Sequence, residues 1–370
     1  MSLKIVIACG GTGGHLFPGI AVAQAAQARG HEVRVLISEK NIDALASEGH
    51  DQLRFEKITA IAMPPVLSLR MVKFLWRCWR TTAACKKLLR DFGADAVLGM
   101  GGFTSLPPLY AGRKLKLPTL LHESNAIPGK SNLLSARFCD LVLLGLGECA
   151  SYFPKARTSV VGTPLREALR APVDRQEAAA FFGMDPQRPV LLVMGGSQGA
   201  RGVNETVLSV IPQLDQQSLQ IIHLTGPQEF YAVQAAYRAF PHRSHVAPFC
   251  QRMEYAYALA TLCISRAGAS SLTELSAFGL PTILIPYPHA AEDHQTKNAE
   301  VFTRAHAALM VQERDLSTGR LLNMIQDLLT HEEARRNLQA NMRNLSPANS
   351  AELVCTAIEE LCAEPRFGRK

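Results

Sequence analysis

The chain has 370 residues, of which 47% are hydrophobic and 19% are charged. This length favours two domains of about 150–200 residues each, and the composition excludes a disordered or fibrous protein. No stretch reaches the roughly 18 uncharged apolar residues of a membrane span, and we expect no secretory signal. The net charge of +7 suits nucleic acid, anionic lipid or a phosphate-bearing substrate.

The cysteines indicate a reduced, cytosolic protein. All nine are scattered along the chain without a C-x-x-C pair, and several fall within strand or helix patterns. Such spacing favours neither a disulfide framework nor a zinc site.

The first apolar run, Leu3 to Cys9, leads directly into Gly10-Gly-Thr-Gly-Gly-His15 and a helix that opens near Pro18. Backbone N–H groups of consecutive glycines can converge on an anion at the positive end of a helix. His15 is a candidate base. A dinucleotide-binding turn is the rival interpretation, but Leu16 stands where its third glycine belongs, although Glu39 follows the next predicted strand.

Apolar strand-like runs alternate with helical patterns along the chain, which predicts an α/β fold of parallel sheets covered by helices. The connection between two such domains is expected within 162–172, and helices are expected at 332–345 and 350–363. Strands are predicted near 3–9, 32–38, 96–100, 118–123, 140–145, 158–162, 189–194, 219–225, 244–248, 262–265, 281–286 and 307–311.

Three glycine clusters, at 10–14, 101–105 and 195–200, follow predicted strands. Each belongs at the carboxyl edge of its sheet, where open parallel sheets bind ligands. Two such edges that face each other would frame a cleft between the domains. Tight turns without a ligand are the alternative explanation.

Residues 64–90 form a basic amphipathic segment that holds both tryptophans of the chain. Such a segment is suited to an anionic membrane surface. The alternative is a helix that buries its apolar stripe against its own sheet. The predicted membrane contacts are Leu69, Arg70, Val72, Lys73, Trp76, Arg77, Trp79 and Arg80. No nucleic-acid-binding pattern stands out.

Five blocks together resemble the MurG family of bacterial N-acetylglucosaminyltransferases, which convert lipid I to lipid II in peptidoglycan synthesis. They begin at Gly10, Gly101, His122, Gly195 and Arg266, in the order seen in that family. The resemblance implies a GT-B architecture with two Rossmann-like domains. We expect an acceptor and membrane domain at 1–163, a UDP-sugar domain at 164–340, and a final helix at 341–370 that packs towards the first domain.

The resemblance also implies roles for individual residues. His15 would accept the proton from the acceptor or orient its pyrophosphate, Arg166 and Ser197 would contact phosphate, and Glu274 would hold the ribose. The backbone at Cys250 would read uracil, and Gln295 would hold the donor sugar, although His294 replaces a glutamine that usually precedes it. The other expected substrate contacts are Thr12, Gly13, Gly14, Asn125, Ala269, Ser270, Ser271, Leu272 and Thr273.

We expect the reaction to need no metal or other cofactor, because no Asp-x-Asp pair occurs. The cluster of His289, Glu292, Asp293 and His294 is interpreted as a solvated helix start rather than a metal site.

The expected partners are UDP-N-acetylglucosamine, lipid I, the anionic cytoplasmic face of the inner membrane and other cell-wall synthesis proteins. Three alternatives remain open: a nicotinamide-dependent oxidoreductase, a non-catalytic sugar-nucleotide-binding module, and a related transferase with another acceptor or donor.

Overall fold

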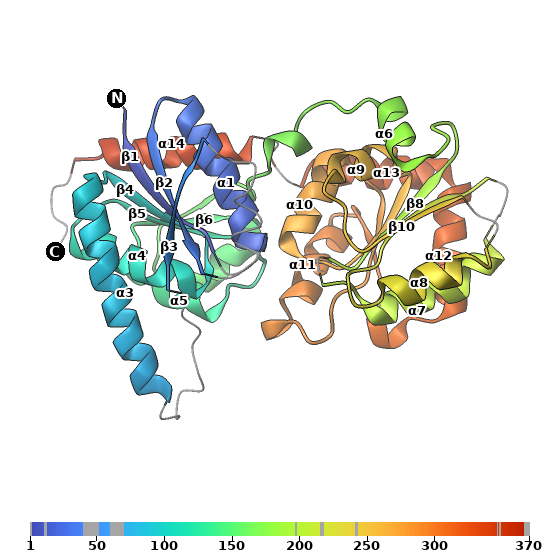
Figure 1. Ribbon diagram of the computed structural model, residues 1–370, viewed down its shortest axis with the longest axis horizontal. Coiled ribbons are helices and arrows are strands. Elements are labelled where there is room, and N and C mark those ends of the chain that lie inside the picture. Colours follow the sequence, from blue (N-terminus) through green and yellow to red (C-terminus); the bar gives the residue numbers. More distant parts are fainter. Residues whose placement is uncertain are drawn as a thin grey trace. The chain divides into compact units, whose positions relative to one another are not determined.

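The computed structural model describes residues 2–10, 13–39, 52–59, 70–196, 198–214, 218–240, 243–345, 347 and 349–365. The chain divides into two compact units (Figure 1). Unit 1 comprises Met1–Arg166 together with Ala348–Lys370, and unit 2 comprises Glu167–Pro347. The division at Arg166 falls within the segment in which the sequence predicts the connection.

Unit 1 contains a seven-stranded parallel sheet in the order β3-β2-β1-β4-β5-β6-β7. Its strands are β1 (Lys4–Ala8), β2 (Glu32–Ser38), β3 (Arg54–Ile58), β4 (Ala96–Gly99), β5 (Thr119–Glu123), β6 (Leu141–Leu144) and β7 (Thr158–Val160). Its helices are α1 (Gly13–Ala28), α3 (Arg70–Phe92), α4 (Gly102–Lys114), α5 (Lys130–Ser135), the 3-10 turn η1 (Gly147–Tyr152) and α14 (Ser350–Ala363).

Unit 2 contains a six-stranded parallel sheet in the order β10-β9-β8-β11-β12-β13. Its strands are β8 (Val190–Met194), β9 (Gln220–Leu224), β10 (Ser244–Ala247), β11 (Leu262–Ser265), β12 (Thr282–Leu284) and β13 (Leu309–Met310). Its helices are α6 (Arg175–Phe182), α7 (Arg201–Val210), α8 (Phe230–Tyr237), α9 (Met253–Leu259), α10 (Ala269–Phe278), α11 (His294–Arg304), α12 (Thr318–Thr330) and α13 (Glu332–Arg343).

These two parallel sheets confirm the predicted α/β class, and every predicted strand is present. The sequence analysis missed β3, which reads Arg-Phe-Glu-Lys-Ile. Three of its five residues are charged, so the segment lacks the apolar run by which the other strands are predicted. These charges are tolerated because β3 lies at the sheet edge, where Glu56 forms an ion pair with Arg34 of β2.

Helix α14 completes the core of unit 1 by packing on α1, although more than 300 residues separate them. Val354, Cys355, Ile358 and Leu361 are buried in the same cluster as the inner strands of the sheet. Polar contacts at the edge of this core also join α14 to the segment after α1. Glu359 accepts hydrogen bonds from Arg29 at 3.0 Å and from His31 Nε2 at 2.9 Å. The end of the chain is therefore part of the first folding unit.

Replacing the fully buried Ile358 with alanine should lower the free energy of unfolding by about 2–5 kcal/mol, because it leaves a cavity under α1. Urea denaturation of the full chain measures this change. The control, Glu360→Ala on the exposed face of α14, should change the unfolding free energy by no more than about 0.5 kcal/mol. Equal effects of the two substitutions would contradict the packing of α14 described above.

Candidate functional site

The candidate site in unit 1 lies at the carboxyl edge of its sheet, where α1 starts shortly after β1. The helix packs closely against the strand end: a Cβ on Gly19 would lie 2.4 Å from the Cβ of Cys9. Gly13 and Gly14 form the first turn of α1, and His15 follows them with a partly exposed side chain. The predicted strand and helix are present, but α1 begins at Gly13 rather than near Pro18, so Gly13, Gly14 and His15 belong to the helix; residues 11 and 12 of the predicted turn lie outside the described residues.

His15 lies against the glycine turn between β4 and α4. A Cβ on Gly101 would be 3.2 Å from His15 Nδ1, and one on Gly102 would be 3.5 Å from His15 Nε2. Both glycines have positive φ angles, 106° and 72°, which side chains disfavour. The turn therefore leaves room for the imidazole ring and holds it at the strand ends.

A buried carboxylate organises the adjacent loop. Glu123, at the end of β5, is only 1% exposed and accepts four hydrogen bonds from the loop that follows and from α5. Its donors are the backbone and side-chain amides of Asn125 (2.9 and 3.0 Å), the Gly129 N–H (3.1 Å) and Asn132 Nδ2 (2.7 Å). Asn132 Oδ1 in turn accepts a hydrogen bond from the Gly102 N–H at 3.2 Å. Glu123 thus fixes Asn125 and, through Asn132, the turn beside His15.

A second histidine, His122, is fully buried behind this loop. Its Nε2 donates to the carbonyl of Gly162 at 2.9 Å, and burial lowers its pKa. Its imidazole is therefore neutral and has a structural partner, whereas the His15 ring is partly exposed.

Arg166 is the last residue of the first segment of unit 1, and its side chain lies beside helix α1. The guanidinium carbon is 4.6 Å from the ring centroid of Phe17, two residues after His15. Stacking on an aromatic ring orients a guanidinium without neutralising its charge. The structure thus brings Arg166, Phe17 and His15 to one region of unit 1.

In unit 2, two glycine turns contact each other at the carboxyl edge of the sheet. Gly199 lies between β8 and α7, and Gly226 follows β9; their φ angles are 79° and 80°. A Cβ on Gly199 would lie 2.3 Å from the carbonyl oxygen of Thr225, and one on Gly226 would lie 2.4 Å from the Cα of Gly199. The two turns therefore pack backbone against backbone, and a side chain at either glycine would separate them.

A buried polar network holds these turns together. Asn204 of α7 donates from Nδ2 to the carbonyl of Thr225 at 3.0 Å, and its Oδ1 accepts from His223 Nε2 at 3.0 Å. His223 Nδ1 then accepts from the hydroxyl of Tyr237 at 3.0 Å. Burial lowers the pKa of His223 to about 3, so the ring stays neutral with one N–H.

Helix α10 supplies the second part of the unit 2 site. Residues 269–274 form its first turns, with Gly268 as the N-cap, and its N–H groups form the positive end of the helix. Leu272 and Thr273 are buried, so their side chains face the interior. Glu274 is partly exposed, and its Oε2 accepts a hydrogen bond from the hydroxyl of Tyr257 at 2.7 Å. Tyr257 thus orients the carboxylate.

Gln295 stabilises the loops beside α10. Its Oε1 accepts hydrogen bonds from the backbone N–H groups of Ala267 at 3.2 Å and Tyr287 at 3.0 Å. Cys250 is 6% exposed, burial raises the pKa of its thiol, and it follows the exposed Phe249. The Gln295 side chain thus holds two backbone segments, and the buried Cys250 thiol stays protonated.

Some predicted residues lie outside the described part of the chain: Thr12, Ser197 and Leu69, together with the side chain of Arg70. Within the described ranges, no group of three His, Cys, Asp or Glu side chains could hold a metal ion. His294 instead places its Nδ1 2.7 Å from the carbonyl of Ala291 at a helix start.

Helix α3 carries its apolar stripe on the surface. Val72 is 70% exposed, Trp76 52% and Trp79 69%, and Leu75, which the sequence analysis did not select, is 59% exposed. Lys73, Arg77 and Arg80 are also exposed. Burial against its own sheet is therefore the wrong interpretation for this stripe, whereas the later residues Cys85 and Leu89 are buried. Figure 1 shows the first turns of α3 extending beyond the sheet of unit 1.

Several residues that build the site were missed from the sequence: Phe17, Glu123, Asn132, Asn204, His223, Gly226, Tyr237 and Tyr257. Thr225-Gly226-Pro227, directly after a predicted strand, is a turn signal that could have indicated the second loop. The tyrosines carry no such signal, because their partners are distant in the sequence.

No helix in the described ranges is long and apolar enough to cross a membrane.

Comparison with known proteins places the chain in a family. The family description "Glycosyltransferase family 28 N-terminal domain" matches residues 5–144, and "Glycosyltransferase family 28 C-terminal domain" matches residues 190–354. A UDP-N-acetylglucosamine–N-acetylmuramyl-(pentapeptide) pyrophosphoryl-undecaprenol N-acetylglucosamine transferase of Geobacter sulfurreducens is 37% identical, covering 98% of this chain and 99% of the relative. The same-named protein of Geotalea uraniireducens is 35% identical over 98% of this chain and 100% of its own.

Solved structures agree with this assignment. The crystal structure of Acinetobacter baumannii MurG has a TM-score of 0.77 and 27% identity, covering 97% of this chain and 100% of that one. A UDP-N-acetylglucosamine 2-epimerase from Neisseria meningitidis has a TM-score of 0.71 at 13% identity, covering 97% of this chain and 100% of that one, and shares the fold alone. The chain therefore belongs to glycosyltransferase family 28 and, within it, to the MurG family.

Proposed function

We propose that this glycosyltransferase moves N-acetylglucosamine from UDP-N-acetylglucosamine to the 4-hydroxyl of the muramyl sugar of lipid I, with inversion, to give lipid II. The position of His15 against the Gly101–Gly102 turn, at the strand ends of a family 28 chain, is the observation that carries this proposal. The names of the relatives give the donor and the acceptor.

In the proposed mechanism His15 is the general base. The acceptor hydroxyl gives its proton to the imidazole while its oxygen attacks the anomeric carbon from the face opposite UDP. The bond between that carbon and the diphosphate oxygen breaks, and UDP leaves with the electron pair. Asn125, whose side-chain amide donates a hydrogen bond to Glu123 at 3.0 Å, would contact the sugar of the acceptor.

The leaving diphosphate needs positive charge that is already in position. In unit 2 the first N–H groups of α10 supply oriented dipoles. Arg166, the expected phosphate contact, would supply a full positive charge. Glu274, oriented by Tyr257, would accept hydrogen bonds from the ribose hydroxyls. These groups bind and polarise the donor without a metal ion.

The alternative functions have less support. An oxidoreductase would need the dinucleotide fingerprint, which Leu16 interrupts, and the family assignment points to glycosyl transfer instead. A binding module without turnover would not need an imidazole at the strand ends.

The exposed stripe of α3 supports binding to an anionic membrane surface on the cytoplasmic side, where a lipid-linked acceptor would be reached. Tryptophan side chains suit the interface between lipid and water, and Lys73, Arg77 and Arg80 would meet anionic headgroups. Arg80 also lies 4.7 Å from the ring centroid of Trp76, which orients both groups on one face.

Substitutions at His15 and Glu274 should affect different steps. His15→Ala should lower kcat by about 10²–10⁴-fold with nearly unchanged UDP affinity, because it removes a base. Glu274→Ala should weaken UDP binding by about tenfold or more, because it removes charge-assisted hydrogen bonds. Steady-state kinetics and calorimetric titration with UDP separate the two effects.

Two controls sharpen this comparison. Added imidazole should restore part of the turnover of His15→Ala if the ring takes the proton, and no rescue would assign it an orienting role. Glu333→Ala, an exposed carboxylate on α13, should leave UDP affinity unchanged. Equal loss of UDP affinity in His15→Ala and Glu274→Ala would contradict the division of roles.

Membrane binding should depend on the cations of α3. A variant with glutamine at Arg70, Lys73, Arg77 and Arg80 should bind phosphatidylglycerol vesicles about 1,000-fold more weakly, since each of the four cations contributes about 1 kcal/mol. Flotation with lipid vesicles at low and high salt measures the change. The matched control places glutamine at four exposed arginines of unit 2, Arg188, Arg238, Arg320 and Arg336. Unchanged binding of the α3 variant would exclude electrostatic attachment through this helix.

A further inference from the structure

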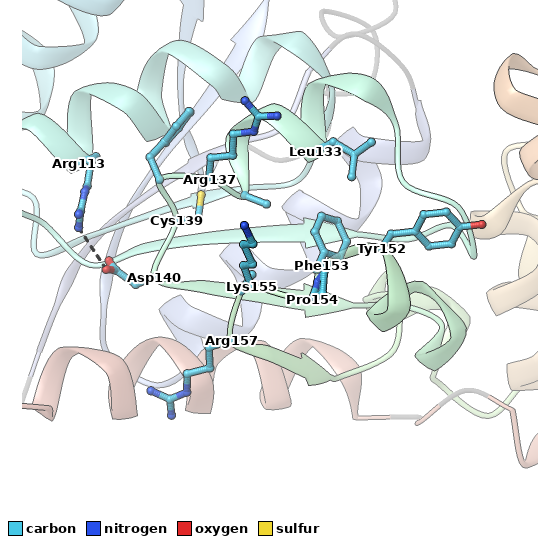
Figure 2. A pocket seen from close by; sticks show the side chains of 13 residues that line it. Arg113, Leu133, Arg137, Cys139, Asp140, Tyr152, Phe153, Pro154, Lys155 and Arg157 are labelled. Carbon is cyan, nitrogen blue, oxygen red and sulfur yellow. Dashed lines mark ion pairs between the residues drawn. The ribbon is translucent and has the colours of Figure 1, made fainter.

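Unit 1 contains a pocket of about 680 Å³ whose lining residues have no role in the proposed reaction. Its lining comes from the end of α4, the segment that follows α5, and the segment between η1 and β7. Figure 2 shows Arg113, Arg137, Lys155 and Arg157 around it, with Leu133, Tyr152 and Phe153 towards one end.

The pocket has an excess of positive charge. Four cationic side chains line it, and Asp140 is its one carboxylate. Asp140 already has partners: it accepts hydrogen bonds from the Thr119 backbone at 2.9 Å and hydroxyl at 3.0 Å, and lies 3.6 Å from Arg113. Arg157 is paired with Glu364 at 2.5 Å.

The other two cations, Arg137 and Lys155, have no carboxylate within ion-pair distance among the described residues. Both residues are exposed to solvent. Burial raises the pKa of the neighbouring Cys139 thiol, so it adds no negative charge. Arg137 and Lys155 line the same pocket without an ion-pair partner in the described part of the chain, so an anion bound there would be attracted to both side chains.

The basic part of this pocket lies away from the strand ends that carry His15. Asp140 directly precedes β6, Arg157 directly precedes β7, and Arg113 is in the last turn of α4, which leads to the start of β5. These positions are at the amino edge of the parallel sheet, whereas His15, Gly101 and Glu123 are at the carboxyl edge. An anion bound here would not occupy the proposed active site.

The lining also defines the class of anion. Arginine presents a planar fork of donors that matches phosphoryl oxygens, and lysine adds a point charge. Leu133 (39% exposed) and Tyr152 (44% exposed) offer apolar surface beside the charges. This combination fits a phosphoryl group attached to a less polar body better than a small inorganic ion alone.

We propose that this pocket, at Arg137 and Lys155, is an anion site that binds phosphoryl groups, separate from the proposed transferase site. The phosphoryl group comes either from an anionic lipid headgroup or from a soluble phosphate compound. Binding there would join the segment that follows α5 to the segment before β7 through a shared ligand.

Backbone amide hydrogen exchange can locate such binding. The full chain is saturated with UDP, so that the proposed transferase site is already occupied. The probes are inorganic pyrophosphate, sodium chloride at equal ionic strength, and vesicles of phosphatidylcholine with or without phosphatidylglycerol. We expect pyrophosphate or the anionic vesicles to slow exchange in residues 133–140 and 152–158. Protection by vesicles alone identifies the headgroup as the source, and protection by pyrophosphate alone identifies a soluble ligand.

The matched variants decide whether the pocket is responsible. Arg137→Gln with Lys155→Gln should weaken binding of the protecting probe about tenfold or more, because two cations are lost. Arg54→Gln with Lys57→Gln removes the same charge from β3, at the opposite edge of the sheet, and should bind as the wild type does. No protection of either segment by any probe, or equal protection in the Arg137/Lys155 variant, would overturn the proposal.

Discussion

Close backbone packing at the carboxyl ends of the parallel strands is the constraint on which the candidate site depends. In unit 2, Gly199 and Gly226 approach so closely that a Cβ on Gly226 would lie 2.4 Å from the other's Cα. In unit 1, the absence of side chains at Gly101 and Gly102 leaves the space that the His15 ring fills. Removing side chains exposes N–H groups, which can then face an anionic substrate.

The two units stabilise these turns by different chemistry. In unit 1 a buried carboxylate, Glu123, gathers four N–H donors around one strand end. In unit 2 a neutral histidine, His223, links a tyrosine hydroxyl to the Asn204 side chain that holds the second turn. Each network satisfies its buried polar groups, and satisfied networks fix a single geometry. That geometry is what a transferase needs in order to place donor dipoles before the reaction starts.

The sequence predicts this fold well because parallel strands buried on both faces read as continuous apolar runs. It fails at β3, since an edge strand with paired charges lacks that signal. The glycine clusters and His15 are predicted from local motifs, and the role of Glu274 is predicted from the resemblance to the family. Tyr257 and Tyr237 act through partners distant in the chain, and Phe17 acts through its stacking with Arg166, which local patterns do not encode. For α3 the sequence leaves burial and membrane contact open, and the exposure of Trp76 and Trp79 decides against burial.

The most direct test of the proposed function is transfer of labelled N-acetylglucosamine from its UDP donor to a short-chain lipid I analogue in the presence of EDTA. The account predicts turnover by the wild-type chain, undiminished by EDTA and strongly reduced in His15→Ala. Tight UDP binding without transfer to this acceptor, or equal turnover by His15→Ala, would contradict it.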